Sequence, residues 1–221
     1  MADEYRLHDM PITQLIAEGD FVSTLWFAWT GVRPDEKTKR ILSACLVACV
    51  DHGEKPPSAM VARTVASCGK PLADSVAAGL LTLGPRHGNA ASAASQWLRD
   101  AIARNESAES IVTKSLTDKR RIPGIGHPEY DIDPRAVKLV EIAKSQLTAT
   151  PHCDLANDVS RVFSERKGKP LPLNVDGAIG ALIADLGAPA DLADAIFIAA
   201  RTVGLIAHAR EEAEQSESYR R

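Results

Sequence analysis

Apolar residues recur every three or four positions along most of this chain, which is the spacing of one face of an α-helix. Residues 34–51 show the pattern clearly: a proline starts the segment, two acidic residues follow, and positions 41, 42, 45, 46, 49 and 50 form one apolar stripe. The same signals predict helices over 57–68, 72–83, 90–104, 108–119, 134–147, 155–165, 175–186 and 191–215. Strand patterns bounded by hairpin turns are missing. The sequence therefore predicts an all-α, multi-helical fold.

The length of 221 residues suits a single domain over 1–221 with a large helical core. Loop-rich stretches at 114–135 and 166–172 bound a smaller helical subdomain, over approximately 107–170, that we expect to move against the rest. The helix predicted over 72–83 is apolar on nearly all sides, which favours burial in a core or in a subunit interface. We expect a homodimer or a higher oligomer.

Charge and composition exclude several classes of partner. The net charge is −3, whereas a nucleic-acid-binding surface normally needs a clear basic excess. No continuous apolar run reaches the ~18 residues of a membrane span, and the polar N-terminus does not resemble a secretory signal. Cys45 and Cys49 lie in an apolar helical stripe and are interpreted as buried, reduced side chains. We expect a cytoplasmic protein that binds neither nucleic acid nor membrane.

Three titratable side chains lie beside glycines at predicted helix ends: His87, His127 and Asp176. Each has a simpler interpretation alone, as a hydrogen-bonded loop histidine or as an acid that complements a helix dipole. Together, two histidines and one carboxylate can remove a proton next to a carbonyl group and stabilise the resulting enolate. The combination indicates an active site.

Longer motifs surround these residues in unbroken order. They are DHG at 51–53, AAGLLTLGPRHG at 77–88, IPGIGH at 122–127, DPR at 133–135, NVDGAIG at 174–180 and RTVGLIAH at 201–208. From about Ile12 onward the chain resembles the citrate synthase superfamily, most closely the citryl-CoA lyase module at the C-terminal end of ATP-citrate lyase. The resemblance implies a citrate synthase-like fold and acyl-CoA chemistry.

The resemblance assigns a role to each catalytic candidate. Asp176 corresponds to the base that takes the methyl proton of acetyl-CoA. His87 corresponds to the donor that holds the thioester oxygen as the enol forms. His127 corresponds to the histidine that polarises the ketone of oxaloacetate and, in cleavage, deprotonates the tertiary hydroxyl of citryl-CoA.

The resemblance also implies the residues that bind the carboxylates of the substrate. His52, Arg135 and Arg201 match positions that hold the oxaloacetate or citrate portion, and guanidinium groups suit carboxylates because they bind them in bidentate fashion. Family members complete the site with an arginine near the C-terminus of the neighbouring subunit. Here Arg220 or Arg221 is the candidate.

Coenzyme A is expected only as part of substrate and product, with no tightly bound cofactor. Many synthases have an arginine for its phosphates shortly after the histidine of the GH motif, whereas residues 128–131 here read Pro-Glu-Tyr-Asp. Positive charge must then come from elsewhere, and the candidates are Lys114, Lys119, Arg120 and Arg121. Backbone amides around Gly124 and Gly126 are the candidates for the adenine side. No metal site is expected, and His208 with Glu212 is interpreted as a surface pair.

The resemblance implies a citryl-CoA lyase that forms acetyl-CoA and oxaloacetate by reversible Claisen-type chemistry. Cleavage is favoured because the chain begins near the point where the later half of full-length citrate synthases starts. One alternative is a citrate or 2-methylcitrate-type synthase that joins an acyl-CoA to a 2-oxo acid. Another is a non-catalytic acyl-CoA-binding subunit, against which the intact set of candidate residues argues.

Overall fold

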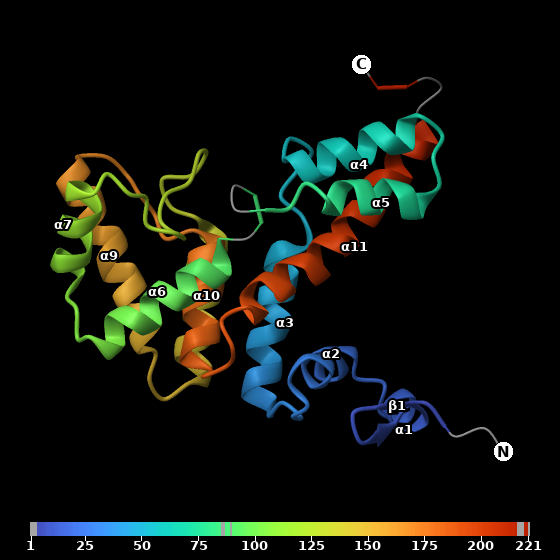
Figure 1. The fold of residues 1–221 in the computed structure, drawn as a ribbon, viewed down its shortest axis with the longest axis horizontal. Helices are drawn as coiled ribbons and strands as arrows, with labels where there is room; N and C mark the ends of the chain where they lie inside the picture. Colours follow the sequence, from blue (N-terminus) through green and yellow to red (C-terminus); the bar gives the residue numbers. More distant parts are fainter. Residues whose placement is uncertain (1–3, 85–86, 89, 216–218, 221) are drawn as a thin grey trace.

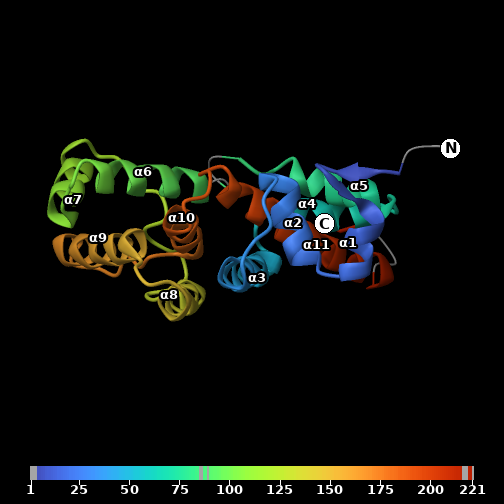
Figure 2. The same cartoon turned by 90° about the horizontal axis from the view of Figure 1, so that it is seen from below.

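The computed structural model describes residues 4–84, 87–88, 90–215 and 219–220. Within them, eleven helices form an elongated molecule with two groups of helices side by side (Figures 1 and 2). One group consists of α1 (Ile12–Glu18), α2 (Phe21–Thr30), α3 (Glu36–Val50), α4 (Pro57–Ser67), α5 (Leu72–Leu80) and the returning α11 (Leu192–Gln215). The other consists of α6 (Ala91–Ala103), α7 (Ala108–Thr117), α8 (Pro134–Gln146), α9 (Pro151–Lys167) and α10 (Val175–Asp185). The predicted all-α fold is confirmed.

All nine predicted helices are present, but α9 begins at Pro151 and not at the predicted residue 155. His152 and Cys153, interpreted from the sequence as loop residues, lie in its first turn. Their backbone N–H groups donate to the carboxylate of Asp185, at 2.9 and 3.1 Å. The prediction was wrong because the acceptor for this helix start comes from the distant end of α10 and not from a local cap.

The N-terminal part contains elements that the sequence analysis did not predict. Strands β1 (Arg6–Leu7) and β2 (Met10–Pro11) pair in antiparallel fashion, with Arg6 opposite Pro11. Helix α2 starts at an N-cap, Asp20, whose carboxylate accepts from the backbone N–H of Ser23 at 3.0 Å. This aspartate before an apolar run was a readable start signal.

The main hydrophobic core joins the two groups, because α3 packs on α8 while α10 and α11 both contribute side chains to it. Helix α10 lies between α6, α8 and α9, and most of its residues are buried. Gly180 permits the approach to α6, since a Cβ there would lie 2.5 Å from the carbonyl oxygen of Ala91. The buried α10 is thus a rigid support for the residues in its first turn.

A second, smaller hydrophobic cluster lies within the predicted subdomain of residues 107–170. It joins α7 to α9 through Val112, Val159, Val162 and Phe163. In Figure 1 the same group of helices also includes α6 and α10, so the grouping extends on both sides of the predicted range. The boundaries and the mobility of this subdomain stay predictions.

Helix α5 differs from the expectation of burial on nearly all sides. Only Ser75 and Gly79 of this helix are buried, and the flanking Leu81 is 86% exposed. Gly79 faces α4, where a Cβ would lie 2.8 Å from the carbonyl oxygen of Ser58. Burial in the core of one chain is therefore wrong for α5, whereas a subunit interface stays a prediction.

Helix α11 is, within the described residues, long and apolar enough on average to cross a membrane, which the sequence analysis did not expect. More than half of that window (56%) is buried inside the protein, and Arg201 in its middle is fully buried. Because core helices pass the same test, this is weak evidence for a membrane span. The expected absence of a membrane partner stays a prediction.

Candidate active site

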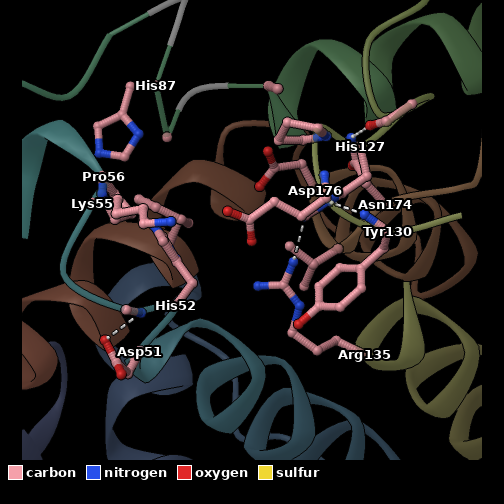
Figure 3. Close-up of a pocket in the computed structure, with 18 of the residues that line it drawn as sticks. Asp51, His52, Lys55, Pro56, His87, His127, Tyr130, Arg135, Asn174 and Asp176 are labelled. Carbon is pink, nitrogen blue, oxygen red and sulfur yellow. Dashed lines mark hydrogen bonds between the residues drawn. The ribbon is translucent and has the colours of Figure 1, made fainter. Parts of the chain in front are cut away.

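A pocket of about 840 Å³ opens between the two groups of helices. Its wall contains all three predicted catalytic residues, His87, His127 and Asp176. Figure 3 shows His87 and His52 on one side of the pocket and His127, Asp176 and Arg135 on the other. Segments far apart in the chain therefore meet at one cavity, as the sequence motifs predicted.

Asp176 lies in the first turn of α10, where Asn174 caps the helix by accepting from the backbone N–H of Gly177 at 3.0 Å. Within the described chain, Oδ1 of Asp176 is buried and has no hydrogen-bond partner. Burial raises the pKa of Asp176 to about 6, even though the nearby Arg135 acts in the opposite direction. A carboxylate in this range can both take and return a proton near neutral pH.

His127 is held by the backbone that follows it. Its Nδ1 accepts hydrogen bonds from the backbone N–H groups of Glu129 and Tyr130, both at 3.1 Å. Its Nε2 lies 3.3 Å from Nη2 of Arg135, a group that can only donate. A neutral imidazole accepts at one nitrogen only, so the bonds from the backbone amides and the bond from Arg135 belong to two different tautomers of His127.

The glycines before His127 allow its loop to contact α10 closely. A Cβ on Gly124 would lie 2.3 Å from the Cα of Gly177, so neither position has room for a side chain. The Asn174 side chain donates to the carbonyl oxygen of Gly126 at 2.8 Å, which ties the loop to the cap of α10. The Gly126 amide donates to Pro172 at 2.7 Å and is therefore already engaged. Coenzyme A binding near Gly124 and Gly126 stays a prediction, and it must use backbone groups other than the Gly126 amide.

Arg135 is oriented by Asp133, a fully buried residue that the sequence analysis quoted but gave no role. The Asp133 carboxylate accepts from Nε and Nη2 of Arg135, at 3.0 and 2.9 Å, and from the backbone N–H of Val175 at 3.0 Å. The sequence Asp-Pro signals a helix start. The bond to Val175 spans 42 residues and could not be predicted from the sequence.

On the opposite wall, His87 contacts a buried serine. Its Nε2 lies 2.9 Å from Oγ of Ser58, at the start of α4. Burial, assisted by the charge of Arg201, lowers the pKa of His87, so the ring is neutral at pH 7. If the Ser58 hydroxyl donates to Nε2, the ring presents an N–H at Nδ1. Ser58 was missed as a site residue, and Pro85, Arg86 and Asn89 of the same motif lie outside the described residues.

The half-buried His52 pairs with the fully buried Arg201 on this side of the pocket. The Arg201 guanidinium contacts Nδ1 of His52, and burial together with that charge lowers the pKa of His52 to about 3. Arg201 is fully buried, and within the described chain its Nε and Nη1 have no hydrogen-bond partner. It lies 5.5 Å from the ring of Phe197 and does not line the pocket itself. A direct contact of Arg201 with substrate stays a prediction, whereas His52 does line the pocket.

Five further candidates do not line the pocket of their own chain: Lys114, Lys119, Arg120, Arg121 and Arg220. The Arg220 guanidinium pairs with Glu212 at 3.1 Å, and its backbone N–H donates to Ser67. Its role in a neighbouring subunit stays a prediction, and the alternative candidate Arg221 lies outside the described residues. Pocket residues that the sequence analysis did not select include Glu54, Lys55 and Tyr130.

His208 and Glu212 are not the surface pair that the sequence suggested. Both are buried: His208 lies 2.8 Å from Asp51, and Glu212 pairs with Arg63 at 2.7 Å. The error arose because the polar end of α11 packs against α3 and α4. Among the described residues, no group of three or more His, Cys, Asp or Glu side chains is arranged to hold a metal ion.

The whole chain, residues 1–221, matches the family described as the C-terminal domain of citrate synthase. The chain belongs to the citrate synthase family. It is 33% identical over 220 residues to ATP-citrate synthase beta chain protein 1 of Arabidopsis thaliana, covering 90% of this chain and 36% of that protein. This chain thus spans about a third of the length of that relative.

Two solved structures extend the family comparison. Citryl-CoA lyase from Hydrogenobacter thermophilus superposes with a TM-score of 0.89 at 38% identity, covering 96% of this chain and 83% of that one. Citrate synthase from Thermotoga maritima MSB8 superposes with a TM-score of 0.77 at 26% identity, covering 99% of this chain and 58% of that one. The resemblance to the citrate synthase superfamily and the predicted fold are confirmed.

Proposed function

We propose that this protein is a citryl-CoA lyase that cleaves citryl-CoA to acetyl-CoA and oxaloacetate. The proposal rests on one observation: His87, His127 and Asp176 line the same pocket. Burial there raises the pKa of Asp176 to about 6, close to neutral pH. The similarity to the lyase from Hydrogenobacter thermophilus, higher in identity and TM-score than the similarity to the synthase above, supports cleavage over synthesis.

Cleavage moves one proton off the tertiary hydroxyl and one proton onto carbon. As the C–C bond breaks, its electrons pass to the carbon next to the thioester, and the negative charge develops on the thioester oxygen. A neutral His87 that presents an N–H can stabilise this oxygen. Burial favours the protonated form of Asp176, which then supplies the proton that completes acetyl-CoA.

The two tautomers of His127 correspond to the two ends of this cycle. When Nδ1 accepts from the backbone amides of Glu129 and Tyr130, Nε2 carries a hydrogen and can donate to the ketone of oxaloacetate. When Nε2 accepts from Arg135, this nitrogen has the lone pair that can take the hydroxyl proton of citryl-CoA. The surroundings of His127 therefore support both directions.

Coenzyme A enters this proposal only as part of the substrate and product. A homodimer is part of the same proposal, since the exposed α5 offers the apolar Leu72 and Leu81 to a second subunit. Cytoplasmic localisation stays a prediction, with which the buried free thiols of Cys45, Cys49 and Cys153 are compatible.

A synthase that joins an acyl-CoA to a 2-oxo acid is the second candidate, favoured by the similarity to the citrate synthase from Thermotoga maritima MSB8. Assays in both directions test the choice. Release of oxaloacetate from synthetic citryl-CoA supports the lyase, whereas citrate formed faster from acetyl-CoA and oxaloacetate supports the synthase. No turnover in either direction would contradict both and favour an acyl-CoA-binding subunit.

A further inference from the structure

One buried carboxylate, that of Asp133, contacts both the proposed substrate-binding Arg135 and the helix that contains Asp176, although it does not line the pocket. Asp133 is the N-cap of α8, and its side chain is fully buried. An N-cap needs an acceptor only for the amides of its own helix. Asp133 accepts one such bond, from the Arg135 amide, and directs its other bonds to the Arg135 side chain and to α10.

The first of these connections fixes a guanidinium. Nε and Nη2 of Arg135 each donate to a different oxygen of Asp133, which is the paired geometry that orients a guanidinium plane. Burial would raise the pKa of Asp133, but the bonds and the charge of Arg135 outweigh it, and the net pKa is lowered. Asp133 is therefore charged at neutral pH, and Arg135 is held where Nη2 reaches His127.

The second connection fixes the start of α10. The backbone N–H of Val175, one of the amides that a helix leaves unpaired at its first turn, donates to Oδ2 of Asp133. Asp176 is the next residue. The N-cap aspartate of α3 lacks such a link: Asp35 is exposed and accepts from Thr38 of its own helix.

We propose that Asp133 is a positioning residue that locks Arg135 and the first turn of α10 into one geometry. It thereby sets both the affinity for the substrate carboxylates and the placement of Asp176. This inference rests on the proposed function, in which Arg135 binds substrate and Asp176 transfers the proton.

Two variants separate the two connections. Asp133→Asn removes the negative charge that takes part in both connections. Val175→Pro removes the N–H that reaches Asp133 and fits the backbone, because proline suits the first position of a helix and the preceding Asn174 is already extended, with ψ at 175°. Val175→Ala is the control for the change of the buried side chain. Asp35→Asn is the matched control, since it alters an N-cap aspartate far from the pocket.

The kinetic expectation is a different pattern for each variant. Asp133→Asn raises the KM for oxaloacetate and lowers kcat, each about tenfold, because both partners lose their fixed geometry. Val175→Pro lowers kcat while KM stays within about twofold of the native value. Asp35→Asn changes neither. If Asp133 were only a helix cap, its variant would lose thermal stability and keep both constants.

A measurement without substrate separates this inference from the proposed function. In ¹³C NMR titrations of the Asp176 carboxyl, Asp133→Asn should shift the midpoint to lower pH, since a negative neighbour is lost while Arg135 remains. If the native protein turns over no substrate, the proposed function fails, yet the same titration in Val175→Pro, which keeps the charge of Asp133, still shows whether Asp133 places Asp176. A native midpoint in folded Val175→Pro overturns the inference, as does a native kcat in that variant. Val175→Pro decides alone if Asp133→Asn does not fold.

Discussion

On the α8–α10 side of the pocket, the polar groups are held by bonds within the chain, whereas on the α3–α11 side a buried charge is only partly paired, by His52 and, at 3.7 Å, by Asp51. Arg135 is fixed by Asp133, and His127 by two backbone amides. Arg201 instead keeps two nitrogens unbonded within the described chain. The first arrangement preorganises donors, and the second leaves a demand for an anion that a substrate carboxylate can satisfy.

This difference predicts two kinds of variant. Changes on the α8–α10 side should mainly lower the rate of the chemical step, because bound geometry is lost. Changes on the α3–α11 side should mainly lower affinity, and some should stabilise the free protein, because a buried charge that is only partly paired is costly.

The largest effect is expected at Asp176. Asp176→Asn keeps the shape of the side chain but cannot transfer a proton, so kcat should fall by about 10³-fold or more with little change in KM. Steady-state kinetics in both directions measure this, with Asp194→Asn as a control that lacks a transferring role in the proposed mechanism. Native turnover by Asp176→Asn would remove the assigned acid/base.

Arg201→Met tests the α3–α11 side of the pocket. Loss of the guanidinium should raise the KM for oxaloacetate by about 10²-fold, because a charge-assisted pair with substrate is lost. The ligand-free protein should lose little stability, because removal of a partly paired buried charge offsets the contacts that the shorter methionine gives up. Thermal unfolding with and without oxaloacetate checks both parts. A large fall in Tm without ligand would show that Arg201 is structurally paired.

The pH dependence distinguishes the direction of reaction. Condensation needs the ionised form of Asp176, so its rate should fall as the pH drops below about 6. Cleavage needs the protonated form, so its rate should fall as the pH rises above the same value. Rate profiles over pH 5 to 8 measure both limbs. The quantity compared is kcat at saturating substrate, because the reaction releases no net proton and the kcat/KM profiles of the two directions must coincide. Coincident kcat profiles would contradict this role.

The same pKa has a consequence for stability. Because folding raises the pKa of Asp176 from 3.8 to about 6, its stabilising contribution is complete below the unfolded value and is lost as the pH rises through 6. The loss is at most about 3 kcal/mol. Unfolding in denaturant at pH 4.5 and 7.5 should show a smaller difference for Asp176→Asn than for the native protein.

The smallest effect is expected at Ser58. Ser58→Ala should lower kcat about tenfold, because His87 loses the partner that selects its tautomer. Ser75→Ala is a matched control, since Ser75 is equally buried but its hydroxyl bonds only to Pro71 in α5. Equal losses in both variants would indicate a general effect of burial and not a role at His87.

Much of this organisation could be read from the sequence, and the limits have physical reasons. Helical periodicity located nine helices, and glycine-flanked motifs identified the residues that meet at the pocket. Periodicity cannot show which long-range acceptor completes a helix start, as at Asp185, nor which carboxylate joins two helices, as at Asp133. It also overestimated burial in α5, because apolar composition alone does not distinguish a core from an interface.

The contact between Gly124 and Gly177 has a further consequence. Because two main chains touch there with no side chain between them, the spacing between the His127 loop and the Asp176 turn is fixed by peptide atoms. Packing of larger residues cannot retune it. Any methyl group added at either position must force the loop and the helix apart. A change in substrate specificity is therefore expected to arise from substitutions in the opposite wall of the pocket.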